Sequence, residues 1–464
     1  SAALLNSATT LNYQIAGVEV AGGTATPASD LGKVTGEVSI AAGATTGTIT
    51  LTPADDGATE GYEGFKVSIL DSAFATVAAS GNVVIMDGAE SGQTFSLTTG
   101  TDSITGTTGN DTISAVLQGQ GADGTTVAPG DSIAGGEGDD TLSIAVAGNQ
   151  NNYTLSAVQT TGVETLAISN FDTDADSTPD LIVDATLMTG LTTVALTSSS
   201  AFGDTSVSSL KNLVDAQMTN GSGDLTVAYQ ASVVTGTSDS QSVALSNVTG
   251  GNFTAAGIET VSIASNTTAN TLTTLTAAAA TTLNFSGDKN LTVTDDLNAT
   301  NAAVRTITST MTGDLSIVEN SSTVTATLGA GNDTYKTSTA VADTYTVNAG
   351  DGEDELSVTA STVLDTALET ARYTNFEALQ INNIAATTAT FSQVMSLLAS
   401  TIDTVTVVAQ DSTAGGAADM TATTALTNAG ASMTLKFESL STAETVFDLT
   451  VAASVAALSD SDAD

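Results

Sequence analysis

A short glycine- and aspartate-rich motif recurs in this chain and limits the folds open to it. Its best copy, Gly135-Gly-Glu-Gly-Asp-Asp-Thr-Leu-Ser143, fits the nonapeptide pattern G-G-x-G-x-D-x-U-x, where U is a large apolar residue, at every fixed position. The glycines permit a tight, partly left-handed turn and bring backbone carbonyls close to a cation. Asp140 adds a carboxylate to the turn. Leu142 lies at the start of a short strand, and its side chain is expected to point into the interior. Such turns stack in a parallel β-roll and hold Ca²⁺ between rungs.

Three further copies of the motif are less complete. They span residues 106–114, 329–335 and 349–357, and all four copies share G-x-D-x-U. This recurrence favours calcium turns, although any single Asp-Gly or Asn-Gly turn without a metal would look similar. The ligand candidates are the carbonyl of the glycine and the carboxylate two residues later in each copy: Gly109 and Asp111, Gly138 and Asp140, Gly331 and Asp333, Gly352 and Asp354.

Two more aspartates precede the first motif copies. Asp102 lies in Thr-Asp-Ser-Ile and Asp131 in Gly-Asp-Ser-Ile. Because a roll site takes oxygens from two successive turns, we expect both carboxylates to face the adjacent rung.

A different acidic loop follows at residues 172–180. Carboxylates at its positions 1, 3, 5 and 9 can point at one hard cation. The loop has Ser177 where a calcium hand usually has glycine, and no glutamate stands at position twelve, so a helix–loop–helix hand is not expected. A single calcium loop and a solvated acidic turn both remain open. The ligand candidates here are Asp172, Asp174, Asp176 and Asp180.

The charge of the chain limits the classes of partner that it can bind. The formal net charge is −43, with 8 basic and 51 acidic residues. Such an excess repels nucleic acid and anionic membranes, which excludes both as partners. It also opposes the compact state by self-repulsion, and bound divalent cations would relieve that repulsion. An acidic, solubilising surface is the alternative.

Histidine, cysteine and tryptophan are absent, which removes several kinds of chemistry. The chain can form no imidazole base, thiolate nucleophile, Cys/His zinc site or disulfide. Paired carboxylates could serve a glycosidase, but aromatic residues make up only 4% of the chain. We therefore expect no enzymatic activity. No apolar run approaches the ~18 residues of a membrane span, so none is expected.

Residues 1–90 are expected to form a small antiparallel β module. Strand-like runs at 34–40, 46–51, 65–70 and 82–86 alternate partly between apolar and polar residues. Through Gly36-Glu-Val-Ser-Ile-Ala-Ala-Gly43, Glu60-Gly-Tyr-Glu-Gly-Phe65 and Val84-Ile-Met-Asp87, the segment resembles a Calx-β domain. That resemblance implies an immunoglobulin-like sandwich that binds Ca²⁺ at one end; turn acids without a metal are the alternative. The ligands that it implies are Asp30, Asp55, Asp56, Glu60, Glu63 and Asp87.

Short strand-like runs rich in Thr, Ser and Val recur through residues 91–385. Three segments are copies of one unit: Gly162-Val-Glu-Thr-Leu-Ala-Ile168, Gly257-Ile-Glu-Thr-Val-Ser-Ile263 and Asn375-Phe-Glu-Ala-Leu-Gln-Ile381. Such repetition predicts a β-solenoid over 91–385, in which each rung buries its apolar face against its neighbours. Residues 386–464 are expected to be a β-rich continuation or cap. Helical patterns occur at 364–373 and 391–398.

The motif copies, the Asp-Ser-Ile turns and the Val-Glu-Thr-Leu unit together are similar to calcium-dependent, RTX-type surface-layer proteins of Gram-negative bacteria and related secreted RTX proteins. The similarity covers roughly residues 95–385. It implies an all-β chain with a parallel β-roll or β-solenoid that binds several Ca²⁺ ions, leaves the cell by type I secretion and self-assembles on the cell exterior. Such proteins also have a region that grips surface polysaccharide, which this sequence does not reveal. The alternative is a calcium-dependent RTX adhesin that binds glycans or other cells.

Overall fold

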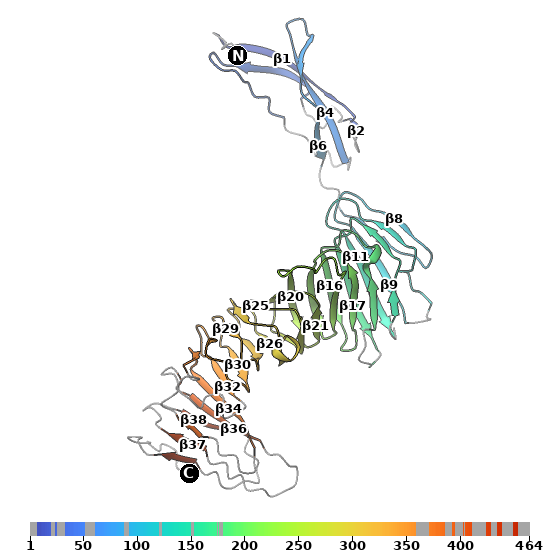
Figure 1. The fold of residues 1–464 in the computed structure, drawn as a ribbon. Helices are drawn as coiled ribbons and strands as arrows, with labels where there is room; N and C mark the ends of the chain where they lie inside the picture. The colour runs from blue at the N-terminus through green and yellow to red at the C-terminus, as the bar shows by residue number, and fades with distance from the viewer. Residues whose placement is uncertain are drawn as a thin grey trace. The chain divides into compact units, whose positions relative to one another are not determined.

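The computed structural model of the chain is all-β. It divides into two compact units: an antiparallel sheet belongs to the first, and most of a parallel β-solenoid to the second (Figure 1). In the part of the chain that the structure describes, the helices are Ala185–Leu187 (3-10) and α1 (Leu297–Thr300), and neither is long and apolar enough to cross a bilayer. The structure describes residues 7–19, 24–25, 33–51, 61–87, 92–119, 123–149, 153–173, 175, 180–358, 371–385, 392–394, 402, 404–410, 424–427, 434–438 and 449–452.

The N-terminal sheet has six strands. Its central pair is antiparallel, with Tyr13 of β1 opposite Gly36 of β3 on one side and Ile69 of β4 on the other. Tyr13 and Ile15 alternate inward and pack with Val38 and Phe65 in a small core of their own. The strands are β1 (Thr9–Gly17), β2 (Thr24–Ala25), β3 (Thr35–Ile40), β4 (Gly61–Leu70), β5 (Thr76–Ala79) and β6 (Val83–Asp87).

This sheet agrees with three of the four strands that the sequence predicts before residue 90. The prediction for residues 46–51 is wrong, because this segment forms no strand, although Ile49 and Leu51 still pack against the core. The structure adds β1, which the sequence reasoning missed. The immunoglobulin-like sandwich, the Calx-β relationship and the domain boundaries at 90 and 385 stay predictions.

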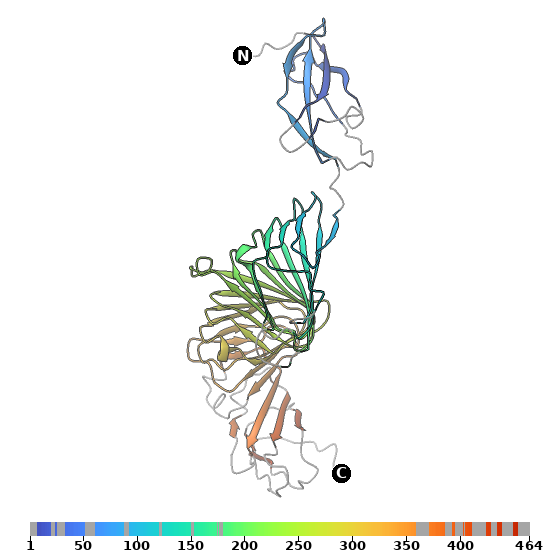
Figure 2. The ribbon, with the colours of Figure 1, turned by 90° about the vertical axis from the view of Figure 1, so that its right-hand side faces the viewer.

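The solenoid is built on one 13-stranded sheet, called here the long sheet (Figure 2). Neighbouring strands of this sheet are two or three strands apart along the chain, and each belongs to the next rung. From β11 onward the strands pair parallel, as in the register Thr141↔Thr165. Its strands are β7 (Thr94–Ser96), β9 (Thr112–Leu117), β11 (Thr141–Gly148), β14 (Thr165–Asp172), β16 (Thr193–Ser199), β18 (Asp215–Gly221), β20 (Ser240–Val248), β22 (Thr260–Asn266), β25 (Thr282–Gly287), β27 (Thr306–Ser309), β29 (Thr325–Thr327), β31 (Val347–Asn348) and β33 (Tyr373–Thr374).

Four smaller sheets complete the rungs. A six-stranded sheet contains β12 (Tyr153–Leu155), β15 (Leu181–Asp184), β17 (Thr205–Leu210), β19 (Leu225–Tyr229), β21 (Asn252–Ala255) and β24 (Thr274–Thr276). An eight-stranded sheet contains β23 (Asn270–Leu272), β26 (Leu291–Asp296), β28 (Leu315–Val318), β30 (Thr334–Thr337), β32 (Glu355–Val358), β34 (Ala378–Ala385), β36 (Thr404–Gln410) and β38 (Thr434–Glu438). Two three-stranded sheets contain β8 (Ser103–Thr105), β10 (Ser132–Ala134) and β13 (Gln159–Thr161), and β35 (Ser392–Val394), β37 (Thr424–Thr427) and β39 (Leu449–Ala452).

Apolar side chains form columns inside the solenoid. In register, Leu142 of β11 lies beside Leu166 of β14, which lies beside Val194 of β16, and all three are buried. Because side chains alternate along a strand, each rung sends every second residue inward and needs the rungs on either side to cover it. One buried cluster of this kind extends along the chain from Leu97 to Leu379. The predicted β-solenoid is thus confirmed.

The helical patterns of the C-terminal region are not borne out where the structure describes them. Ser392–Val394 is strand β35 and Tyr373–Thr374 is strand β33. Residues 364–370, 391 and 395–398 lie outside the described residues. The apolar spacing there suited a helix in isolation, but parallel pairing with neighbouring rungs overrides so weak a preference.

Candidate metal centre

The four motif copies stack as two pairs of successive turns. Turns 106–111 and 135–140 precede β9 and β11 of the long sheet, whereas turns 329–333 and 350–354 precede β30 and β32 of the eight-stranded sheet. In both pairs the first aspartate donates its backbone N–H to Oδ1 of the second. The distance is 2.7 Å from Asp111 to Asp140 and 2.7 Å from Asp333 to Asp354. The same two-turn arrangement therefore occurs in two different sheets.

Glycine is required in these turns for close stacking as well as for conformation. Gly136 has φ 116°, and a Cβ there would lie 1.9 Å from the carbonyl oxygen of Thr107 in the preceding turn. Gly350 has φ 106°, and a Cβ there would lie 2.1 Å from the carbonyl oxygen of Gly329. Any side chain would therefore separate the two turns.

The aspartates of the motif are buried. Asp111, Asp140, Asp333 and Asp354 are each 1% exposed or less. Two of them have both oxygens satisfied by the chain. Asp111 accepts from the N–H groups of Gln93 and Thr107, and Asp333 accepts from the N–H of Leu315 (2.7 Å) and that of Gly329 (2.9 Å). Such hydrogen bonds offset part of the cost of burying a charge.

Asp354 is different, because one of its oxygens has no such donor. Its Oδ1 accepts from Asp333, but its buried Oδ2 has no hydrogen-bond partner. Burial, together with the nearby carboxylates of Asp333, Glu377 and Glu353, raises the pKa of Asp354 to about 7. Burial likewise raises the pKa of Asp333 to about 6. An orphaned carboxylate oxygen in a column of acids fits a hard cation such as Ca²⁺.

Basic side chains do not neutralise this column. The two ion pairs within the described ranges are Lys289–Asp288 (2.9 Å) and Arg372–Asp343, and both involve exposed carboxylates. Nor do three or more acidic side chains converge on one point anywhere in those ranges. A calcium ion between the turns would therefore take much of its shell from backbone carbonyls, and Gly331 and Gly352 are the candidates in this pair.

Asp131 and Asp102 form a further column in the solenoid. Asp131 is fully buried, and its Oδ1 accepts from the N–H of Asp102 in the preceding rung at 2.9 Å. Its Oδ2 accepts from Ala128 at 2.8 Å. Asp102 accepts from the N–H and the hydroxyl of Thr98. Both carboxylate oxygens of Asp131 therefore already accept hydrogen bonds from backbone N–H groups.

The loop at 172–180 leads into a third column that sequence reasoning missed. Asp172 and Asp180 are buried, whereas Asp174 and Asp176 lie outside the described residues. Asp224 donates its N–H to Asp204 at 3.0 Å. Both carboxylates line a hollow of about 360 Å³. A signal for them exists in the sequence, since each follows a glycine and immediately precedes a strand, as in Gly203-Asp204 and Gly223-Asp224.

The acidic candidates of the N-terminal module are only partly described. Glu63 lies in β4 and is 2% exposed. Asp87 is the last residue of β6, where it pairs with Gly61, and its side chain lies outside the described part. Asp30, Asp55, Asp56 and Glu60 also lie outside it. A calcium end on this module therefore stays a prediction.

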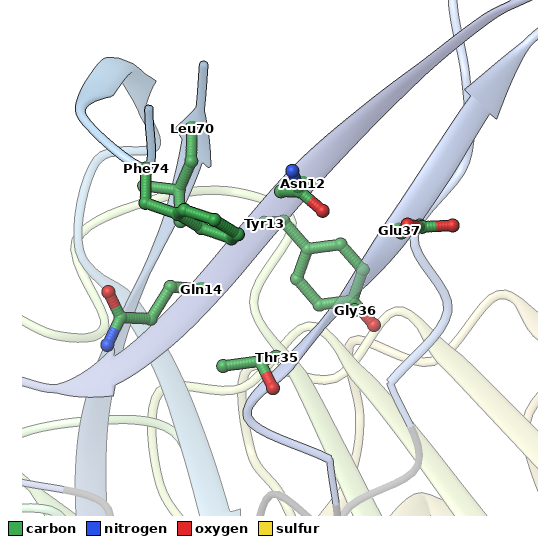
Figure 3. A pocket seen from close by; sticks show the side chains of 8 residues that line it. All are labelled: Asn12, Tyr13, Gln14, Thr35, Gly36, Glu37, Leu70 and Phe74. Atoms are coloured by element: carbon green, nitrogen blue, oxygen red, sulfur yellow. The ribbon is translucent and has the colours of Figure 1, made fainter. Parts of the chain in front are cut away.

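The N-terminal sheet also has a hollow of about 380 Å³ (Figure 3). Residues of β1 and β3 line it, including Tyr13, whose ring lies over Gly36, and the turn after β4 adds Phe74. Phe74 is 70% exposed and has φ 61°. Amide and carboxylate side chains of Asn12 and Glu37 share this hollow with the two rings.

Comparison of the chain with protein-family models and with curated protein sequences finds no match.

Proposed function

We propose that this chain is a secreted structural protein whose solenoid folds with Ca²⁺ and then assembles with copies of itself on the cell exterior, as a surface layer or filament. The observation that carries the proposal is the pair of turns at Asp333 and Asp354. There a buried carboxylate oxygen has no hydrogen-bond partner and lies in a column of like charges. Buried charges of this kind are normally paired or bind metals.

Calcium would act by making the column of acids compatible with folding. The ion supplies positive charge to the ionised aspartates; Asp354 and the carbonyls of Gly331 and Gly352 would hold it. Extracellular calcium modules bind with Kd of about 10⁻⁴–10⁻³ M. At tenfold above Kd, each such site adds about 1.4 kcal/mol to the folded state. With a net charge of −43, the chain would stay expanded at low calcium and fold outside the cell.

Assembly would use surfaces that a solenoid offers at its ends. Within the described ranges, β7 has one neighbour, β9, in the long sheet. An open edge of this type can pair with another chain. Surface polysaccharide would be the second partner.

The N-terminal hollow favours a second candidate, a calcium-dependent adhesin. An exposed aromatic ring beside amide and carboxylate side chains, as at Phe74, Asn12 and Glu37, suits a sugar. In this version the solenoid is a spacer and the ligand is a glycan or another cell.

Electron microscopy of the purified chain with Ca²⁺ and with a chelator tests the choice, with circular dichroism on the same samples. Ordered sheets or fibres only with Ca²⁺ support assembly, and monomers that bind cells support the adhesin. If chelation changes neither fold nor assembly, the proposal is wrong.

A further inference from the structure

The three copies of the glutamate-containing unit share one geometry at the start of a rung. Each copy has a residue with positive φ, then a buried apolar residue, then a glutamate directly before a strand. The residue with positive φ stands where the motif has its glycine: Asn375 lies two residues before Glu377, as Gly352 lies two residues before Asp354. The three copies are Gly162 (φ 57°)-Val163-Glu164 before β14, Gly257 (φ 79°)-Ile258-Glu259 before β22 and Asn375 (φ 60°)-Phe376-Glu377 before β34.

In the last copy the glutamate reaches back to the calcium candidate of the preceding rung. Asp354 donates its N–H to Oε2 of Glu377 at 2.9 Å, and Glu377 donates its own N–H to the carbonyl oxygen of Asp354 at 3.0 Å. The contact continues the column, because Asp333 already donates to Asp354. Glutamate is one methylene longer than aspartate, which lets it span a rung where the tight glycine turn has ended.

Three carboxylates therefore follow one another at this corner. Asp354 stands between Asp333 and Glu377, and the negative charges of both carboxylates disfavour its ionised form, whereas the N–H that Asp333 donates favours it. Its Oδ2 is buried without a hydrogen-bond partner, and neither described ion pair lies in this column. A divalent cation next to Asp354 would meet the carboxylate of Glu377 as well, and the number of charged ligands tunes calcium affinity.

We propose that Glu377 supplies a second carboxylate to the calcium site of Asp354, so that unit 375–377 closes the site of the last motif turn. This inference rests on the proposed function, because it requires calcium at that turn. Asp239 and Glu259 make the same contact, at 2.9 Å, but the turn before Asp239 is not a copy of the motif. There the glutamate is structural only.

Terbium luminescence of the full chain isolates this corner. The chain has no tryptophan, so tyrosine alone sensitises a bound Tb³⁺, and Tyr335 is fully buried two residues after Asp333. The part of the signal that Tyr335→Phe removes reports on this site, and its displacement by Ca²⁺ gives the affinity. Glu377→Gln is compared with Glu353→Gln, which removes an equal charge from an exposed side chain of the preceding turn.

We expect Glu377→Gln to lower the calcium affinity of this site at least about tenfold, and Glu353→Gln to lower that affinity much less. Glu377→Asp keeps the charge but shortens the side chain, so we expect an intermediate loss, and circular dichroism in saturating Ca²⁺ shows that each variant folds. Equal affinities for Glu377→Gln and Glu353→Gln, with the site abolished by Asp354→Asn, would overturn this inference alone. If Asp354→Asn leaves unchanged the part of the terbium luminescence that Tyr335→Phe removes, the proposed function would be overturned too.

Discussion

The backbone N–H of Asp333 lies 2.7 Å from Oδ1 of Asp354, although 21 residues separate them in the chain. Asp111 and Asp140 repeat this relationship at the same distance across 29 residues. The two segments between the paired aspartates differ in length, and the two pairs of turns lead into different sheets, so the equality reflects the turn and not its surroundings. Each such pair therefore acts as one unit.

Asp140→Asn is expected to lower the calcium dependence of stability. Asparagine keeps the oxygen that accepts from Asp111 but removes the buried charge that a cation would compensate. At tenfold above Kd the loss of one site costs about 1.4 kcal/mol. Urea unfolding in calcium and in chelator measures this loss in the free energy of unfolding.

The matched control is Asp139→Asn, which removes the same charge from the exposed neighbour in the turn. A loss for Asp140→Asn that is as large in chelator as in calcium would mean that the aspartate serves only the hydrogen-bond column.

Gly136→Ala is expected to destabilise the solenoid by about 3 kcal/mol, since it combines left-handed strain with overpacking. The new Cβ would lie 1.9 Å from the Thr107 carbonyl oxygen. Gly100→Ala is the control, because a Cβ there meets nothing closer than Thr98 Oγ1 at 3.7 Å, and we expect a change within about 0.5 kcal/mol. Thermal unfolding compares the two. Equal stabilities would show that the turns can separate without cost.

The local signals in the sequence were sufficient for the class of fold. In the motif, the glycine turn followed by an inward apolar residue such as Leu142 predicts a strand, and repetition of that pattern predicts a solenoid. β1 was missed even though Leu11, Tyr13 and Ile15 alternate with Asn12 and Gln14 in the pattern of a half-buried strand.

The stacking of rungs could not be predicted in the same way. The adjacency of Asp333 and Asp354 depends on which strands pair, and no single turn encodes it. Asp204 and Asp224 were missed because their turns lack the G-x-D spacing, and only parallel pairing of β17 with β19 brings them together. The role of Glu377 also needs the rung before it to be known.

Glu259→Gln is expected to leave the number of bound calcium ions unchanged. Glu259 accepts from Asp239 at 2.9 Å, and glutamine retains an oxygen for that hydrogen bond. With no motif turn at this corner, only a modest loss of stability, about 1 kcal/mol, is expected. Elemental analysis of the dialysed protein counts the ions, with wild type and Asp354→Asn beside it. If Glu259→Gln bound one calcium ion fewer than wild type, Glu259 would belong to a calcium site outside the motif.

Glu319→Gln is expected to change how stability depends on pH. Glu319 is 1% exposed, its Oε1 accepts from Ser321 at 2.7 Å, and burial, opposed by that hydrogen bond and aided by the charge of Asp296, raises its pKa from 4.5 to about 7. Between these two values the folded chain binds more protons than the unfolded chain, so this group makes stability fall as pH rises through that window. Glutamine has no charge to bury and keeps the acceptor oxygen. In chelator, the variant should therefore gain about 2 kcal/mol relative to wild type between pH 5 and pH 8. Urea unfolding at the two pH values measures the gain, and Glu137→Gln, at an exposed turn, is the control. A difference between Glu319→Gln and wild type that stays constant across this range would contradict the raised pKa and mean that water solvates the ionised carboxylate in the folded chain.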